Sequence, residues 1–136
     1  MRYLILILLP LISFSQSDVP DKYWLDDGNF EEVINGNSAF GDDDQETVVI
    51  EFWAKFNEVN CFAEWEDIEN AKYYRVDIAK APETKKKYKV RMAPTIIIFK
   101  GGIKETVFKA GLDLELPADL EEIQEAINEV NTASKF

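Results

Sequence analysis

Two strongly apolar segments limit what this chain can fold into. The first, Val48 to Trp53, is apolar apart from Glu51. The second, Thr95 to Phe99, begins directly after Pro94. Apolar runs without regular polar alternation are typical of central strands that are covered on both faces. Segments with helical spacing lie between and after these runs, so the sequence predicts an α/β domain.

The remaining elements follow in an alternating order. We expect helices where apolar residues recur at helical spacing, and strands where they alternate or run together. Gly101-Gly102 predicts a hairpin turn. The expected further strands are Lys22 to Leu25, Tyr73 to Ile78 and Lys104 to Lys109. The expected helices are Phe30 to Ile34 (capped by Asp26-Asp27), Cys61 to Asn70, Pro82 to Lys89 and Pro117 to Val130, with a frayed tail over residues 131–136.

Residues 1–15 have the pattern of a secretory signal peptide. Arg2 is followed by the almost wholly apolar segment Leu4 to Ile12, and small residues precede the expected cleavage after Ser15. The apolar segment is too short for a stable membrane span, although an uncleaved anchor is the alternative. We expect a periplasmic or otherwise exported mature chain without a membrane span, in which residues 16–21 form a linker before a domain at 22–130.

Composition excludes several functions. The 136 residues carry a net charge of −11, which argues against nucleic acid and anionic lipid as partners. Without histidine the chain lacks the commonest general base, and with one cysteine it has no intrachain disulfide. Nothing resembles a cofactor motif. The run Asp42-Asp43-Asp44 is interpreted as a solvated loop, because three consecutive carboxylates do not have the alternating spacing of a calcium loop. We expect neither cofactor nor metal.

The chain resembles the thioredoxin family over roughly Lys22 to Val130, and most closely from Tyr74 to Gly111. Val48 to Phe56 resembles the strand that leads into the thioredoxin active site, and Gly111 matches a glycine that faces that site. The resemblance implies a thioredoxin fold, which is a mixed central sheet with helices on both faces, and a cis peptide bond before Pro94. The matching positions are Asp77, Ile78, Pro82, Tyr88, Val90, Arg91, Pro94, Thr95, Ile96, Phe99, Lys100 and Gly102.

The chain departs from this family at the redox site. Asn57 and Asn60 occupy the positions of the two cysteines, so neither position can supply the thiolate on which dithiol exchange depends. The following helix is also shortened by about two turns, or seven residues, relative to thioredoxins. Cys61 lies one position further on. It is interpreted as a small buried hydrophobe, with a monothiol that forms a mixed disulfide as the main alternative and a peroxidase-type cysteine as a third.

The resemblance also implies roles for other residues. Glu51 matches a buried acid of thioredoxins and Arg75 a basic residue on the neighbouring strand, so we expect a buried ion pair. In thioredoxins the backbone before the cis-proline pairs with an extended peptide. The corresponding peptide-binding groove would comprise Phe56, Asn57, Glu58, Val59, Met92, Ala93, Pro94, Gly111 and Leu112. An alternative docking surface is the basic segment Lys80 to Lys89, whose lysines otherwise form a solvated face.

These observations predict a redox-inactive, exported thioredoxin-like protein rather than an enzyme. Its expected partner is a protein, or an extended peptide segment of one, within a bacterial cell-envelope complex. The alternative is a thiol-dependent role carried by Cys61 alone.

Overall fold

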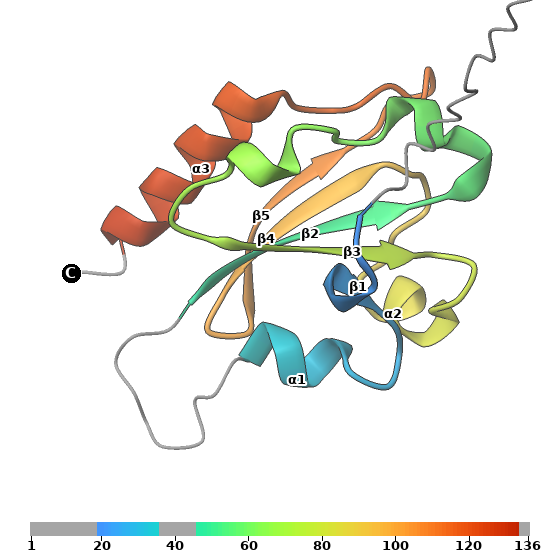
Figure 1. Cartoon of the computed structure of the whole chain (residues 1–136), viewed down its shortest axis with the longest axis horizontal. Coiled ribbons are helices and arrows are strands. Elements are labelled where there is room, and N and C mark those ends of the chain that lie inside the picture. Colours follow the sequence, from blue (N-terminus) through green and yellow to red (C-terminus); the bar gives the residue numbers. More distant parts are fainter. Residues whose placement is uncertain (1–18, 36–45, 134–136) are drawn as a thin grey trace, which may run out of the picture.

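The computed structural model describes residues 19–35 and 46–133 and contains a five-stranded mixed sheet (Figure 1). The strand order is β1-β3-β2-β4-β5. Strands β1 (Trp24–Leu25), β2 (Thr47–Trp53) and β3 (Lys72–Asp77) are parallel to one another. Strands β4 (Thr95–Lys100) and β5 (Ile103–Lys109) are added antiparallel. The thioredoxin fold and its mixed sheet are therefore confirmed.

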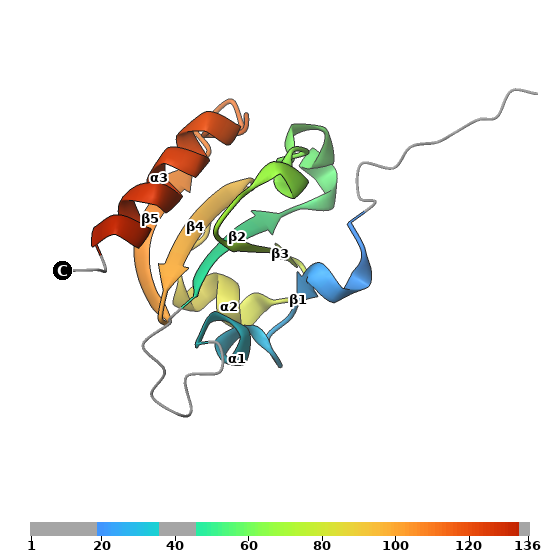
Figure 2. The same ribbon diagram turned by 60° about the vertical axis from the view of Figure 1, so that its left-hand side comes forward.

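Helices cover both faces of the sheet (Figure 2). The short helices α1 (Phe30–Asn35) and α2 (Pro82–Lys87) lie on one face, and the long helix α3 (Leu120–Ala133) lies on the other. All seven residues of β2 are buried, as expected for its position in the middle of the sheet. Because successive side chains of a strand point to opposite faces, Ile50 packs in the cluster of α1 while Val49 packs in the cluster of α3.

The expected helix from Cys61 to Asn70 is wrong. That segment contains only one turn of 3-10 helix, η4 (Trp65–Asp67), and a second 3-10 helix, η3 (Lys55–Asn60), lies directly before it. Phe62, Trp65 and Ile68 still pack against the α3 side of the core. Their spacing of three residues equals one turn of a 3-10 helix, so it predicts a buried face without deciding between the two helix types.

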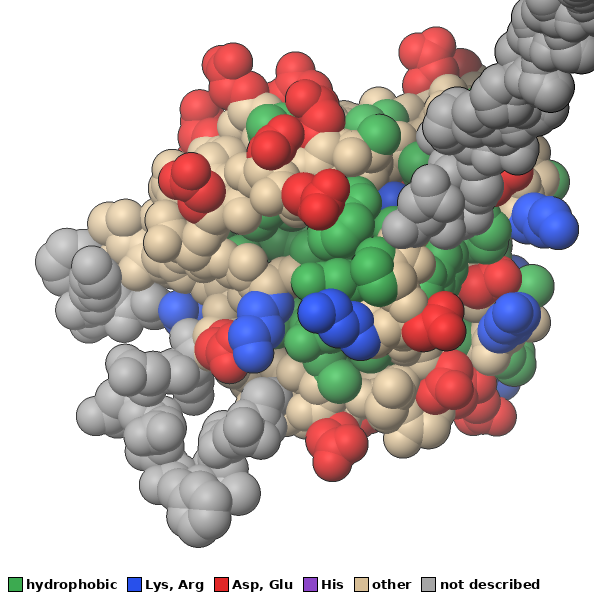
Figure 3. Space-filling view, viewed as in Figure 1, with side chains coloured by type: hydrophobic (Ala, Val, Ile, Leu, Met, Phe, Trp, Pro, Cys, Tyr) green, Lys and Arg blue, Asp and Glu red, His purple; other side chains and the backbone are tan. Residues whose placement is uncertain are grey.

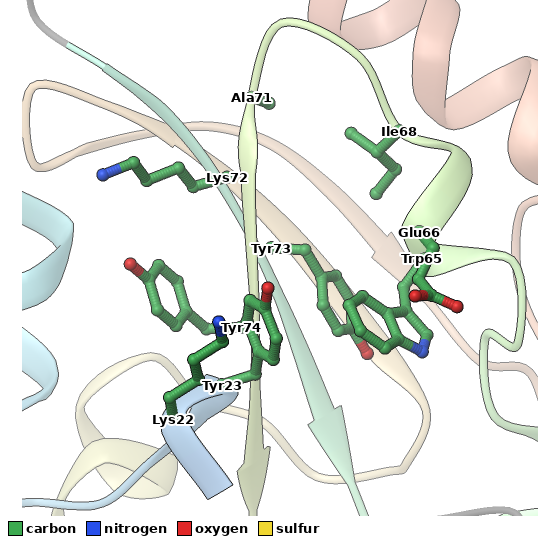
Figure 4. A pocket seen from close by; sticks show the side chains of 9 residues that line it. All are labelled: Lys22, Tyr23, Trp65, Glu66, Ile68, Ala71, Lys72, Tyr73 and Tyr74. Carbon is green, nitrogen blue, oxygen red and sulfur yellow. The ribbon is translucent and has the colours of Figure 1, made fainter. Parts of the chain in front are cut away.

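A hollow of about 640 Å³ lies beside β3. Tyr23, Trp65, Tyr73 and Tyr74 contribute aromatic rings to its wall (Figure 4). Trp65 stacks on Tyr73 with ring centroids 5.4 Å apart. Apolar side chains gather in the middle of this face, with basic side chains along one border (Figure 3).

Asp27 caps a different helix from the one the sequence predicts. Its carboxylate accepts hydrogen bonds from the backbone N–H groups of Glu83 and Thr84 and from the Thr84 hydroxyl, at 2.7 to 3.1 Å. These donors lie in the first turn of α2, whose free N–H groups need acceptors. Asp27 therefore connects the segment before α1 to the start of α2. The latter helix ends at Lys87, and Lys89 has a φ of 56°.

The ends of the domain also differ from the prediction. Helix α3 begins at Leu120 rather than Pro117, after a reciprocal capping box between Asp119 and Glu122 with hydrogen bonds of 2.9 and 3.1 Å. It continues to Ala133, so the frayed tail predicted from residue 131 is wrong for residues 131–133. Asn131 is held by the Thr47 hydroxyl and by the backbone carbonyl of Asn70.

At the other end Val19 is buried, and its carbonyl accepts a hydrogen bond of 3.0 Å from the Trp24 indole. The short 3-10 helix η1 (Asp21–Tyr23) follows. Val19 thus packs on the domain and Asp21 begins a 3-10 helix, so the predicted linker over residues 16–21 does not hold for these two residues. The predicted signal peptide, the Asp42 to Asp44 loop and residues 134–136 lie outside the described residues. Within the described ranges, no helix combines the length and apolar character that a membrane span requires.

The β4–β5 hairpin follows the sequence prediction. Gly101 and Gly102 have φ values of 60° and 81°, the left-handed conformation that the two central positions of a tight hairpin turn require. A Cβ on Gly102 would collide with the Asn35 side chain at the end of α1. The glycine therefore serves both the turn and the close approach of α1 to the hairpin.

Candidate functional site

The predicted site lies beyond the C-terminal end of β2, where three segments meet. These are η3, the loop before β4 that contains Pro94, and the loop of residues 110–117 between β5 and α3. The Ala93–Pro94 peptide bond is cis, as the sequence predicts. The structure therefore brings together the three stretches from which the groove was predicted.

Asn57 and Asn60 connect these segments through their side-chain amides. Asn57 Nδ2 donates to the carbonyl oxygens of Ala93 at 2.9 Å and Leu114 at 2.8 Å. Asn60 Nδ2 donates to Asn57 Oδ1 at 2.8 Å and to the Leu114 carbonyl at 3.1 Å. We call this set of hydrogen bonds the asparagine clasp. The two residues at the cysteine positions thus form a polar tie between loops that are distant in the sequence.

The asparagine clasp contradicts one part of the groove prediction. Ala93 was expected to offer a free backbone to an extended peptide. Instead Ala93 is only 1% exposed and its carbonyl is already bonded to Asn57. A peptide that pairs with this carbonyl would have to displace the asparagine amide, so the expectation of a free backbone edge at Ala93 is wrong. Pro94 beside it is also buried.

Three other predicted residues project into solvent. Phe56 is 76% exposed, Val59 79% and Leu112 92%. Phe56 and Val59 lie three residues apart on η3, and Leu112 lies in the loop that the clasp ties to η3 through Leu114. We call Phe56, Val59 and Leu112 the apolar patch. Exposed apolar groups on neighbouring segments are a common feature of sites for other molecules.

The remaining predicted residues border the patch. Met92 and Glu58 are partly buried, whereas Gly111 is exposed. The Gly111 carbonyl accepts a hydrogen bond of 3.0 Å from the Leu114 N–H, which closes the turn that presents Leu112. The Glu58 carbonyl accepts one of 3.1 Å from the Cys61 N–H. These backbone bonds fix the shape of the two loops.

Glu51 and Arg75 form the expected ion pair. They face each other in the β2–β3 register, both side chains are fully buried, and Arg75 Nη2 lies 3.1 Å from Glu51 Oε1. Tyr73 donates its hydroxyl to the same carboxylate at 2.6 Å and accepts from Arg75 Nε at 2.8 Å. Burial raises the pKa of Glu51, an effect that Arg75, Tyr73 and the backbone N–H of Phe62 oppose. The pair is therefore part of a larger buried network.

This network also holds the segment that follows the asparagine clasp. The Phe62 N–H donates to Glu51 Oε2 at 3.0 Å, and Arg75 Nη2 donates to the Phe62 carbonyl at 3.0 Å. Both backbone groups of Phe62 are thus bonded to the ion pair. The ion pair therefore anchors the backbone directly after Cys61 to the β2–β3 pair.

Cys61 is poorly placed for thiol chemistry. The residue is 9% exposed and its thiol is free. Burial is the main effect that raises the pKa of Cys61, and the nearby Glu51 and Glu58 raise it further, whereas Arg75 lowers it. Because the thiolate is the reactive form, a raised pKa and low exposure both reduce reactivity. No cluster of three potential metal ligands occurs in residues 19–35 and 46–133.

Comparison with known proteins agrees with this geometry. The chain belongs to the thioredoxin family, whose model matches residues 22–127. It is a thioredoxin-like domain with a single cysteine, and therefore lacks the Cys-x-x-Cys pair. No significant match was found among curated protein sequences.

Solved thioredoxin structures share the fold. Thioredoxin of Schistosoma mansoni is 23% identical with a TM-score of 0.59, over 78% of this chain and 92% of that one. Thioredoxin of Malassezia sympodialis (Mala s 13) is 23% identical with a TM-score of 0.58, over 78% and 89%. Thioredoxin f2 of Chlamydomonas reinhardtii is 13% identical with a TM-score of 0.57, over 79% and 94%. At these identities the comparison concerns the fold alone.

Two participating residues were missed by sequence reasoning. Leu114 provides the carbonyl that accepts from both asparagines, and its φ of 57° is unusual for a leucine. Nothing in its side chain signals this role, since it acts through the backbone. Tyr73 joins the Glu51–Arg75 pair through its hydroxyl. Its place two residues before Arg75 puts both side chains on the same face of the strand, and this spacing could have predicted the contact.

Proposed function

We propose that this chain is an exported, redox-inactive thioredoxin-like module that binds an extended segment of a partner protein within a bacterial cell-envelope complex. The observation that carries the proposal is the apolar patch. Three of the four large apolar side chains that are exposed in the described residues lie in it. The leader-like residues 1–15 support export.

The asparagine clasp suits the patch to binding. Side chains on loops that are already fixed lose less conformational freedom when they bind. Phe56 is the natural anchor, because aromatic residues dominate the binding energy of protein interfaces. Since the Ala93 carbonyl is occupied, recognition is expected to rely on side-chain contacts with Phe56, Val59 and Leu112 and on the neighbouring Met92.

The experiment compares two variants of exposed apolar residues. Phe56→Asp in the patch should reduce recovery of a partner from envelope extract at least about tenfold, because a charge replaces an interface anchor. Ile103→Asp is the matched control. Ile103 is the fourth exposed apolar residue, 64% exposed, and it begins β5 at the opposite end of the sheet. Equal recovery by the two variants would contradict the proposed surface.

A redox assay separates this proposal from the thiol-dependent alternative. We expect no reduction of insulin above the background of dithiothreitol, and normal partner recovery by Cys61→Ser. Loss of partner recovery in Cys61→Ser, with Phe56→Asp unaffected, would favour the mixed-disulfide alternative.

A further inference from the structure

A second hollow, of about 520 Å³, lies between the segment that follows α2 and the β4–β5 face of the sheet. We call it the basic pocket. Its volume falls in the range of small-molecule sites, about 300 to 1,000 Å³. The lining residues are Tyr88, Lys89, Arg91, Met92, Thr95, Ile97, Lys104, Val107, Lys109 and Ala110.

The charge of the basic pocket is opposite to that of the chain. Lys89, Arg91, Lys104 and Lys109 line it and no acidic residue does, although the whole chain has a net charge of −11. The ion pairs formed within the described part of the chain involve other basic residues, Lys72, Arg75 and Lys87. The four cations are therefore available to an anionic ligand.

Protection of a sheet edge explains only part of this arrangement. Lysines on an edge strand such as β5 discourage pairing with another chain, which accounts for Lys104 and Lys109. It does not account for Lys89 and Arg91, which come from a different segment and line the same hollow. Convergence of cations from two segments on one cavity is typical of an anion-binding site.

The other side chains of the pocket are largely apolar. Ile97 is buried, and Val107, Met92 and Tyr88 are partly buried. Ile97 pairs with Val107 and Thr95 with Lys109 across β4 and β5, so the pocket lies over paired strands rather than along a free edge. A ligand there must bind through side chains, which favours a compact molecule over a peptide that adds a strand.

We propose that the basic pocket binds an anionic amphiphile, meaning a small molecule with one carboxylate or similar acidic head and a short apolar tail. The head group contacts the exposed cationic side chains at the pocket's border, and the tail lies against Ile97, Val107 and Met92. Phe56, Val59 and Leu112 do not line this pocket, although Met92 borders both surfaces, and the inference does not depend on the function proposed for the apolar patch.

Decanoate, used well below its micelle concentration, tests the proposal by calorimetry and by NMR of the methyl groups. We expect binding with shifts at Ile97, Val107 and Met92, and much weaker binding of the uncharged 1-decanol. The variant Lys104→Glu/Lys109→Glu should bind decanoate about tenfold more weakly than wild type. The variant Lys89→Gln/Arg91→Gln should also bind decanoate more weakly, but by less than tenfold, because it removes two charges without reversing them. The second variant keeps the test decisive if the first is unstable.

The control is Lys80→Glu/Lys86→Glu, which changes the net charge by the same amount at two exposed lysines outside the pocket. It should bind decanoate normally. Equal weakening in this control, equal binding of decanol, or absence of decanoate binding would overturn the proposal. Binding of a hexaglutamate peptide but not of decanoate would also overturn it and assign the pocket to acidic protein segments.

Discussion

Replacement of Asn57 by alanine should destabilise the domain, although Asn57 stands where the family carries a reactive group. The substitution removes three hydrogen bonds, two donated by Nδ2 to the carbonyls of Ala93 and Leu114 and one accepted by Oδ1 from Asn60. It also leaves the carbonyl of the buried Ala93 without this donor. The asparagine clasp is thus a structural element whose contribution can be measured.

The magnitude follows from the net value of a hydrogen bond, about 0.5 to 1.5 kcal/mol. Three such bonds give about 2 to 4 kcal/mol for Asn57→Ala. Asn60→Ala removes two bonds and should cost about 1 to 3 kcal/mol. Because Asn57 and Asn60 bond to each other and share the Leu114 carbonyl, the double variant should cost less than the sum of the single ones.

Urea denaturation of the wild type and the three variants measures these differences. Val59→Ala is the control, since this side chain lies on the same 3-10 helix, is 79% exposed and should change the free energy of unfolding by less than about 0.5 kcal/mol. A cost below about 0.5 kcal/mol for Asn57→Ala would refute the reasoning. So would strict additivity of the two asparagine substitutions.

Other predictions concern the core, the hairpin and the thiol. Arg75→Met should cost about 3 to 5 kcal/mol in urea denaturation, because it leaves the buried Glu51 carboxylate unpaired. Burial raises the pKa of Glu51 in the folded protein above the ordinary value of 4.5. The free energy of unfolding of the wild type should therefore exceed that of Glu51→Gln most below pH 4.5, and the difference should shrink as the pH rises through the raised pKa. A difference that grows with pH would mean that the attraction of Arg75 outweighs burial. Gly102→Ala should lower stability by about 1 to 2 kcal/mol through its positive φ and the collision with Asn35, and an unchanged melting temperature would contradict this. Cys61 should react with a disulfide reagent at least about a hundredfold more slowly in the native than in the unfolded protein, whereas equal rates would show an accessible thiol.

The strands were the most predictable part of the fold. Five of five appear in the expected order, because runs such as Val48 to Trp53 reflect burial on both faces, a property that the sequence itself carries. The α-helix predicted from Cys61 to Asn70 was wrong because an apolar spacing of three suits both 3-10 and α-helices. The role of Asp27 was missed because its acceptor function depends on tertiary packing against α2, 56 and 57 residues further along the chain.

In the candidate site, the exposed apolar residues were predictable from the sequence, whereas the hydrogen bonds of the two asparagines were not. Family positions identified the exposed Phe56, Val59 and Leu112, since side chains at matching positions of a shared fold point in matching directions. For Asn57 and Asn60 the same alignment showed only that they cannot supply the thiolate of a dithiol exchange, and it did not show which hydrogen bonds they form. Their bonding partners are backbone carbonyls of residues 36 to 57 positions away, and no side-chain pattern marks such acceptors.

The asparagine clasp and the buried ion pair together explain how this domain keeps its site without the family's dithiol and with a shorter helix. Asn57 and Asn60 tie η3 to the two neighbouring loops, while Glu51 and Arg75 hold both backbone groups of Phe62 just beyond. Such ties are reversible and need neither an oxidant nor a partner thiol. The same ties occupy the Ala93 carbonyl, so the proposed recognition relies on the apolar side chains that the clasped loops present. Under the function proposed here, the two asparagines that stand in place of the cysteine pair also direct recognition from the backbone to the exposed side chains.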